Sequence, residues 1–170
     1  MEYFDVINEK DEVIQVLPRS EVYKHLHQHR IVHILIFNDQ GEMLLQKRSK
    51  NTRYKPLAWS TSVGGHINAG ESYEDAGLRE YQEELGTTSP LKLLGKDWYI
   101  NTDTEYKDMI GHKKILCTFT SINNGPFAID KNDVEEVAFF PLAEIKKMIH
   151  NDEKFHPELL FLLKKYYTIS

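Results

Sequence analysis

The apolar residues of this chain gather in short runs, many of them rich in β-branched and aromatic side chains, which predicts a fold with many strands. Residues 3–8 and 12–17 are two such runs joined by a polar segment, and they predict an N-terminal hairpin over 3–17. Residues 31–37 predict a buried strand, and residues 42–48, which follow a turn, predict its partner strand. Further strands are predicted over 60–66, where Gly64-Gly65 breaks the run, and over 91–101, 115–122 and 134–140.

Helical periodicity is strongest over residues 72–85. Ser72 followed by Asp75 makes an approximate capping box at the start, and Gly86 is suited to end the helix. Other helices are predicted over 19–27, 143–149 and 157–167, the last two within a C-terminal segment, 141–168. Because the helices do not alternate regularly with the strands, the order favours an α+β fold, a three-layer α/β/α sandwich, over a parallel doubly wound sheet.

The composition is that of an ordinary single domain. The chain has 170 residues, 41% hydrophobic and 28% charged, and no linker or repeat divides it, so one domain over 1–170 is expected. Cys117 is the only cysteine, which excludes a disulfide within the chain. The net charge of −5 argues against a nucleic-acid partner, and no secretory signal or membrane-spanning stretch is evident. We therefore expect a cytoplasmic protein that acts on a small molecule, with no nucleic-acid or membrane partner.

One helix carries the most informative chemistry. At about 100° per residue, Arg79, Glu80, Glu83 and Glu84 fall within a sector of roughly 140°, and the apolar residues of the helix lie on the other side. Carboxylates this close repel one another, and a hard divalent cation such as Mg²⁺ or Mn²⁺ relieves the repulsion. A solvated acidic face is the ordinary interpretation of such a helix. The glycine-rich segment 64–70 favours a ligand site, because it lets main-chain groups approach a ligand closely.

The same segment is similar to the Nudix box, which spans residues 65–87 here. Every fixed position of that motif is matched at the right spacing, by Gly65, Glu71, Arg79, Glu80, Glu83, Glu84 and Gly86. Two packing positions depart from it, since Tyr81 replaces an aliphatic residue and Thr87 replaces the last apolar one. The chain is therefore identified as a member of the Nudix superfamily, whose fold is an α/β/α sandwich with a mixed central sheet.

The resemblance implies a metal-dependent pyrophosphohydrolase, an enzyme acting on phosphorus-containing acid anhydrides. The metal ligands that it implies are Glu80, Glu83, Glu84 and the main-chain carbonyl of Gly64. They would bind one or more Mg²⁺ ions, for which Mn²⁺ could substitute. Arg79 would pair with Glu71 and hold the loop against the helix. Water would then attack a phosphorus of a nucleoside diphosphate linked to another group, X.

Other residues are candidates for the remaining roles. In some family members the first glutamate of the cluster, here Glu80, is the general base, and in others the base lies on a distant loop. The candidates for a distant base are Glu105, Asp108, Glu135 and Glu136. His66 and Gly65 are candidate substrate-binding residues, and Arg48 could bind the phosphates of the substrate.

A wider resemblance, over about residues 4–119, is to type I isopentenyl diphosphate isomerase, which shares the Nudix fold. It rests on phrases such as Leu44–Ser49 and Trp59–His66. The isomerase needs a cysteine where this chain has Gly64, and a glutamate pair where the strand match places His112 and Lys114. Alkene protonation would then lack both its acid and its base. The resemblance therefore implies the isomerase-like branch of the Nudix hydrolases.

Three functions stay open from the sequence. The hydrolase is favoured, because a module that only sensed a nucleotide could lose Glu83 or Glu84 without harm. A non-catalytic nucleotide-sensing Nudix module is the second, and an isopentenyl diphosphate isomerase is the third. The loops 51–58 and 101–113 are expected to select X, which no second motif names. The N-terminal hairpin and the C-terminal helices could support a homodimer.

Overall fold

A computed structural model describes all residues of the chain, 1–170. The strands are β1 (Tyr3–Ile7), β2 (Val13–Pro18), β3 (His29–Phe37), β4 (Met43–Arg48), β5 (Trp59–Ser60), β6 (Val63–His66), β7 (Lys92–Ile100), β8 (Lys113–Ile122) and β9 (Val134–Phe140). The helices are α1 (Arg19–Lys24), α2 (Tyr73–Leu85), α3 (Leu142–His150) and α4 (Pro157–Tyr167), with a 3₁₀ turn η1 (Lys107–Met109). None of the helices combines the length and the apolar character needed to cross a bilayer.

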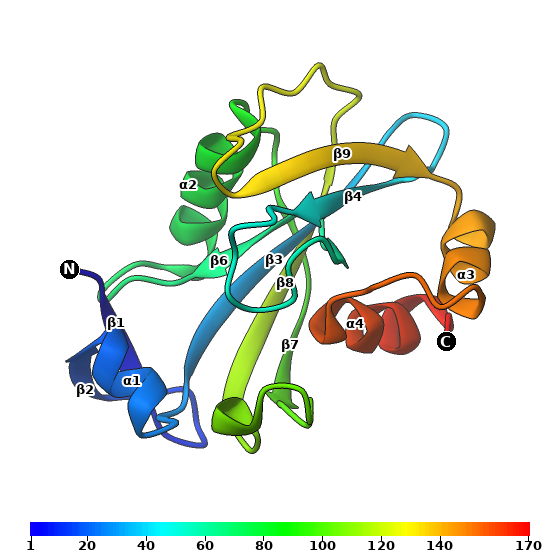
Figure 1. Cartoon of the computed structure of the whole chain (residues 1–170). Coiled ribbons are helices and arrows are strands. Elements are labelled where there is room, and N and C mark those ends of the chain that lie inside the picture. The colour runs from blue at the N-terminus through cyan, green and yellow to red at the C-terminus, as the bar shows by residue number, and fades with distance from the viewer.

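A seven-stranded mixed sheet forms the centre of the molecule (Figure 1). Its main path runs β5-β4-β3-β8-β7, with β6 beside β3 and β9 beside β4. β3 and β8 are parallel, from His29 opposite Lys114 to Phe37 opposite Ile122, and the other pairs are antiparallel. The mixed sheet and the α+β sandwich predicted from the sequence are confirmed.

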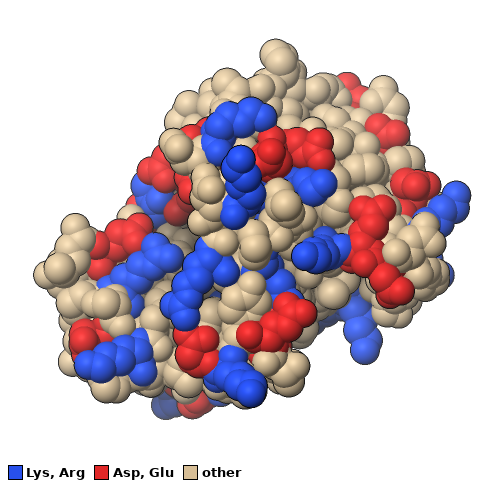
Figure 2. Space-filling model, in the orientation of Figure 1, with Lys and Arg blue, Asp and Glu red and all other residues tan.

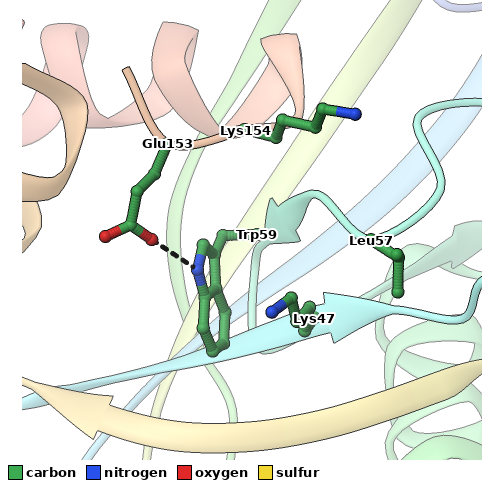
Figure 3. Close-up of a pocket in the computed structure, with 5 residues that line it drawn as sticks. All are labelled: Lys47, Leu57, Trp59, Glu153 and Lys154. Carbon is green, nitrogen blue, oxygen red and sulfur yellow. Dashed lines mark hydrogen bonds between the residues drawn. The ribbon is translucent and has the colours of Figure 1, made fainter. Parts of the chain in front are cut away.

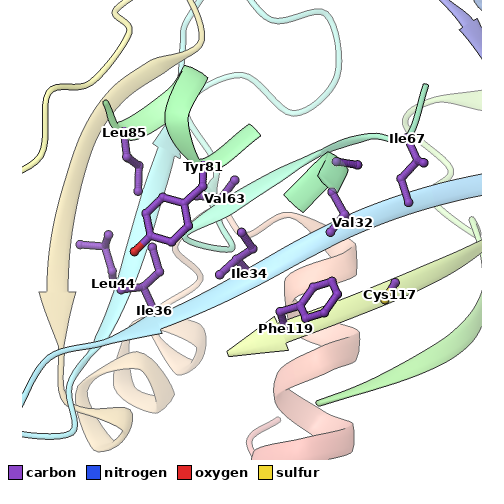
Figure 4. Close-up of a cluster of buried hydrophobic side chains, with 11 residues drawn as sticks. Val32, Ile34, Ile36, Leu44, Val63, Ile67, Tyr81, Leu85, Cys117 and Phe119 are labelled. Carbon is purple, nitrogen blue, oxygen red and sulfur yellow. The ribbon is translucent and has the colours of Figure 1, made fainter. Parts of the chain in front are cut away.

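Alternate residues of β3 face two hydrophobic cores on opposite sides of the sheet. Ile34 belongs to the core beneath α2, where Tyr81 and Leu85 of that helix are buried (Figure 4). Leu35 belongs to the other core, where it meets Leu159 of α4. The sheet therefore separates α2 from α3 and α4, and each side of β3 faces a different layer.

The β1–β2 hairpin supports the glycine-rich loop before α2. The Tyr3 carbonyl accepts a hydrogen bond from the Ala69 N–H at 2.8 Å, and Asp5 Oδ2 accepts one from the Gly70 N–H at 3.1 Å. Phe4 packs beneath these contacts in a small core that includes Val22 of α1. The N-terminal segment is thus joined directly to the loop that leads to α2.

Strand β4 corrects one prediction from the sequence. It was expected to pair with β3 across the turn, but the two strands pair only at Phe37 and Met43. β6 takes the place beside β3 instead, from Ile31 to Ile34. β4 diverges and pairs along its whole length with β9.

Two element boundaries also differ from the predictions. The run 60–66 forms two strands, and the break falls at Thr61-Ser62, so that β6 continues through Gly64-Gly65. The side chains of Thr61 and Ser62 donate to the carbonyls of Val63 and Leu44, which satisfies groups that a continuous strand would pair in the sheet. α1 is shorter than predicted, because Leu26 takes a positive φ of 53° that a helix cannot include.

Candidate active site

Helix α2 begins and ends where its sequence indicates. The Ser72 Oγ accepts a hydrogen bond from the Asp75 N–H at 3.1 Å, which caps the first turn. Gly86 ends the helix in the left-handed conformation at φ 68°, and its N–H donates to the Gln82 carbonyl. Both ends of the helix are therefore fixed, and with them the positions of the carboxylates along it.

Arg79 ties α2 to the loop that precedes it. Its Nε and Nη2 donate to the two carboxylate oxygens of Glu71 at 2.7 and 2.9 Å, a bidentate pair. Nη2 also donates to the His66 carbonyl at 2.9 Å, and Nη1 donates to Glu80 at 2.7 Å. The bonds between Arg79 and Glu71 lower the pKa of the carboxyl and raise the pKa of the guanidinium, so both groups are charged. The pairing of Arg79 with Glu71 expected from the Nudix resemblance is present.

The three glutamates of the predicted metal site differ in exposure. The side chain of Glu83 is 58% exposed and that of Glu80 14% exposed, whereas Glu84 is buried. Burial raises the pKa of Glu80 to about 7. Burial, together with the nearby charge of Glu80, raises the pKa of Glu84 to about 8. Burial thus makes ionisation of both carboxyl groups costly, although Arg79 contacts Glu80, and a bound cation would lower that cost.

Gln46 is a site residue that sequence reasoning missed. Its Nε2 donates to Glu84 Oε2 at 2.7 Å and to the Ser62 carbonyl at 3.3 Å. The Gln46 hydrogen bond and the nearby Gly64 backbone both favour the ionised form of Glu84. One feature of the sequence could have identified it. Gln46 is a polar residue two positions after Leu44, so it lies on the face of the predicted strand that points into the core.

The donor set fits a hard divalent cation. In this structure no group of three or more histidine, cysteine, aspartate or glutamate side chains converges as a ready metal cage. Arg79 accounts for part of this, because it holds Glu80 and lies 3.3 Å from Glu83. Gly65 leaves the space that the Glu80 carboxylate occupies, since a Cβ there would overlap it. Carboxylate oxygens that cluster on one helix face, two of them on largely buried side chains, are the type of ligand that suits Mg²⁺.

The two candidate substrate-binding side chains lie in different surroundings. His66 stacks on Phe4 with 4.7 Å between ring centres, and its Nε2 lies 2.5 Å from the Tyr23 hydroxyl. Burial holds the pKa of His66 well below its usual value. Arg48, at the end of β4, donates from Nε to the carbonyl of Tyr54 at 3.0 Å, and burial lowers its pKa. A guanidinium with a neutral partner can still bind an anion.

Three of the four candidate distant bases contact basic side chains, and two of these contacts join the loops expected to select the substrate. These three pairs are Lys55–Glu105 at 2.7 Å, Arg53–Asp108, and Lys47–Glu136 at 3.4 Å; Lys55 also contacts Asp103 at 2.9 Å. Glu135, the fourth candidate, is exposed on β9. The pairs of Lys55 and Arg53 fasten residues 51–58 to residues 101–109.

A surface pocket of about 300 Å³ lies beside Leu57 of the first of these loops (Figure 3). Trp59 forms one wall, with its Nε1 donating to Glu153 at 3.1 Å and the Lys47 ammonium 5.3 Å from its ring centre. Leu57 and Lys154 complete the lining. Acidic and basic side chains are interleaved over the face seen in Figure 2, so attraction of an anion on that face depends on individual basic side chains.

Residues 27–163 match the family model described as the NUDIX domain. A Nudix hydrolase of Yersinia pestis is 25% identical over 169 residues, which cover 99% of this chain and 87% of that protein. The Nudix hydrolase YfcD of Escherichia coli is 26% identical over 145 residues, covering 85% of this chain and 76% of that protein. A Nudix hydrolase of Nostoc is 41% identical over 86 residues, covering 50% of this chain and 51% of that protein.

Solved structures share the fold of this chain. A crystal structure from Deinococcus radiodurans has a TM-score of 0.81 and 24% identity, covering 98% of this chain and 99% of that one. The MutT protein of Methanosarcina mazei has a TM-score of 0.63 and 26% identity, covering 78% and 87%. The NUDIX domain of Shewanella oneidensis NrtR, complexed with ADP ribose, has a TM-score of 0.62 and 19% identity, covering 89% and 98%.

Proposed function

Because this chain belongs to the NUDIX domain family and is a Nudix hydrolase, we propose that it is a Mg²⁺-dependent pyrophosphohydrolase cleaving a nucleoside diphosphate linked to another group, X. The observation that carries the proposal is the pair of adjacent carboxyl groups on α2, Glu80 and Glu84. Both have raised pKa values, and the hydrogen-bond partner of Glu84 is a neutral amide. A divalent cation beside them would remove the cost of keeping both ionised.

The residues that would hold the cation are Glu80, Glu83, Glu84 and the carbonyl of Gly64. When bound, Mg²⁺ supplies positive charge that neutralises the diphosphate and makes a coordinated water more acidic. Glu80 is the candidate general base on α2; its pKa of about 7 belongs to the metal-free protein, and a bound cation would hold its carboxylate ionised. Arg79 and Glu71 act as positioning residues, since they hold the loop on the helix.

Residues outside α2 would bind the rest of the substrate. Arg48 is the candidate for a phosphate oxygen, because its Nε partner is a neutral carbonyl. Gly65 lies on β6 against Glu80, and the main-chain carbonyl of His66 accepts from Arg79, so the backbone of these two residues borders the proposed diphosphate site, while the His66 ring packs on Phe4. ADP ribose, the ligand of the Shewanella domain, is itself a nucleoside diphosphate linked to a sugar, so sugar-linked nucleotides belong among the substrates to be tested.

The test is hydrolysis of a panel of nucleoside di- and triphosphates, sugar nucleotides, dinucleotides and isopentenyl diphosphate, with Mg²⁺ or Mn²⁺. Glu83→Gln removes one metal ligand from an exposed position, so we expect turnover to fall at least a hundredfold, about 3 kcal/mol. We expect its melting temperature to stay near the wild-type value.

Glu74→Gln is the matched control, because Glu74 is an exposed acid in the first turn of the same helix, outside the site. It should hydrolyse the substrate at the wild-type rate. Near-normal turnover by Glu83→Gln would contradict the metal-ligand assignment. Nucleotide and Mn²⁺ binding without any turnover by the wild-type protein would favour the sensing module instead.

The isomerase-like branch is part of the proposal, and the isomerase reaction is not. A Cβ at Gly64 would lie 2.9 Å from His33 Nδ1, so the cysteine of the isomerase has no room in this arrangement. Lys114, at one of the glutamate positions, is engaged with Glu158 at 2.6 Å. Isopentenyl diphosphate in the panel separates these functions, since a change of double-bond position in the product would reveal an isomerase.

A homodimer also belongs to the proposal. β2 exposes three apolar side chains, Val13, Ile14 and Val16, at 49%, 63% and 50% of their surface. A second copy of this chain that covered them would remove this apolar surface from water. Light scattering of the purified protein measures the oligomeric state directly.

A further inference from the structure

A buried carboxylate lies on the α4 side of the sheet, away from α2. Glu158, in the first turn of α4, is 4% exposed. Its Oε1 lies 2.6 Å from Lys114 Nζ, and its Oε2 accepts from His33 Nε2 at 2.7 Å. Burial acts to raise the pKa of Glu158, but Lys114 and the His33 hydrogen bond hold it well below its usual value. The protein therefore keeps a charged group in its interior.

His33 connects this carboxylate to β6. In the sheet it stands opposite Gly64 of β6 on one side and opposite Thr118 of β8 on the other. His33 Nδ1 lies 2.8 Å from Thr61 Oγ1, and the Thr61 hydroxyl donates to the Val63 carbonyl at 3.0 Å. The contacts thus run without a gap from α4 to the residue before Gly64.

Stability alone does not explain this chain of polar groups. A buried ion pair is often no more stable than apolar residues of the same volume, because desolvation of the charges offsets their attraction. The chain ends on the segment that carries Ser62 and Gly64, and Gln46 joins this segment to Glu84, because its Nε2 donates both to the Ser62 carbonyl and to Glu84 Oε2. A small shift of this segment would therefore alter the surroundings of Glu84.

We propose that Glu158, His33 and Thr61 form a positioning chain that fixes the Gly64 backbone against the Glu84 carboxylate. Glu158 holds His33 from α4, His33 contacts Thr61 beside Gly64, and Thr61 hydrogen-bonds to the Val63 carbonyl. The inference deepens the proposed function, on which its catalytic consequence rests. None of the three residues needs to touch the substrate.

Thr61→Val tests the last link, because it removes the hydroxyl and keeps the volume of the side chain. We expect amide hydrogen exchange at residues 63–65 of the metal-free protein to become about tenfold faster, as NMR would measure residue by residue. Thr61→Ser keeps the hydroxyl and is expected to restore exchange to within about twofold of wild type. Glu158→Gln, which weakens the anchor at the other end, should change the exchange rate in the same direction by a smaller factor.

Thr118→Val is the matched control. Thr118 is fully buried beside the same histidine, but its hydroxyl has no hydrogen-bond partner. Its replacement removes the same atoms without breaking the chain, so exchange at 63–65 should stay at the wild-type rate. Equal acceleration by Thr118→Val and Thr61→Val would overturn the proposal, because it would show a general loosening of the core. Unchanged exchange in Thr61→Val would overturn it as well.

A second readout separates this inference from the proposed hydrolase function. Thr61→Val is expected to bind Mn²⁺ about tenfold more weakly and to lower kcat about tenfold with KM nearly unchanged, and Thr61→Ser to restore both. A rise in KM with kcat unchanged would contradict a role at Gly64. If the wild-type protein hydrolyses nothing in the panel, the proposed function fails, and the exchange and Mn²⁺ measurements still decide the positioning chain.

Discussion

Gly65 matters for both packing and the proposed chemistry, because it lies directly against the Glu80 carboxyl group. A Cβ at this position would overlap the Glu80 carboxyl group, while the backbone of Gly65 does not need a positive φ. Gly65→Ala therefore leaves the backbone unstrained and displaces the Glu80 carboxylate. We expect a loss of at least tenfold in kcat, with a melting temperature within about 4 °C of wild type. Steady-state kinetics and thermal denaturation measure the two effects.

Wild-type turnover in Gly65→Ala would have a definite meaning. The Glu80 carboxylate would then be free to move without affecting the reaction, and Glu80 would lose its place as a metal ligand and candidate base. A large loss of stability would point elsewhere, to contacts of β6 that the added methyl group disturbs.

At the same scale, the sequence predicts some contacts of the site and cannot predict others. The Arg79–Glu71 pair follows from the spacing of the Nudix box and is present in the structure. Helical periodicity places Glu83 and Glu84 in one sector, yet one is exposed and the other buried. The sequence also does not show that Glu84 is contacted by Gln46, which reaches it from a strand 38 residues away in the sequence.

At the scale of the elements, the end of α2 offers a matched pair of glycines. Gly86 has a φ of 68°, and a Cβ there would lie 2.9 Å from the Ala128 Cβ; Gly41 has a φ of 76° with open space around it. Gly41→Ala should cost about 1 kcal/mol from backbone strain, and Gly86→Ala about 2–3 kcal/mol because overpacking against Ala128 is added. Urea denaturation of both variants measures the difference.

Equal losses in the free energy of unfolding of these two variants would show that the segment around Ala128 moves to make room for the added methyl group. In that case the end of α2 would be set by the backbone conformation of Gly86 alone. A larger loss at Gly86 would show that the segment 126–129 fixes the last turn of the helix, which carries Glu83 and Glu84.

Element boundaries are predictable from the sequence where residues within the element itself mark them. α2, β9 and α4 were predicted within a residue of their observed ends, because caps and hydrophobic periodicity mark them within the segment itself. The antiparallel pairing of β4 with β3 is present only next to the turn, because β6 pairs with the rest of that edge of β3. The position of the break between β5 and β6 was also missed, since it rests on hydroxyl contacts of Thr61 and Ser62 with carbonyl groups.

At the scale of the whole molecule, two sets of buried groups respond to pH in opposite directions. Burial lowers the pKa of His29 and His156 to about 3 and that of His112 to about 4, so the folded protein keeps them neutral. Burial raises the pKa of Glu80 to about 7 and that of Glu84 to about 8, so the folded metal-free protein keeps these carboxyls protonated below those values. The stability of the fold therefore depends on pH at both ends of the neutral range.

The sign of each contribution follows from which state binds more protons. The unfolded chain protonates its histidines below about pH 6.5, so the stability that they contribute is full above that pH and is lost as the pH falls. The carboxyl contribution is full below about pH 4.5 and is lost as the pH rises through the folded values of Glu80 and Glu84. We expect the metal-free protein to be most stable near pH 6.5, and to lose about 1 kcal/mol by pH 5 and about 1.5 kcal/mol by pH 8.5. Urea denaturation at each pH measures this profile.

Mg²⁺ should change only the alkaline side of that profile. Ionised Glu80 and Glu84 can bind the cation, whereas their protonated forms cannot, so affinity rises with pH. At a hundredfold excess over Kd, binding to the folded state adds about 2.7 kcal/mol, which would offset the loss at pH 8.5 and leave stability at pH 5 nearly unchanged. A profile that Mg²⁺ leaves unaltered would mean that the two carboxyls titrate without binding metal. The free-energy cost of ionising these two buried carboxyl groups would then not be offset by a bound cation. The metal site would have to lie elsewhere in the molecule.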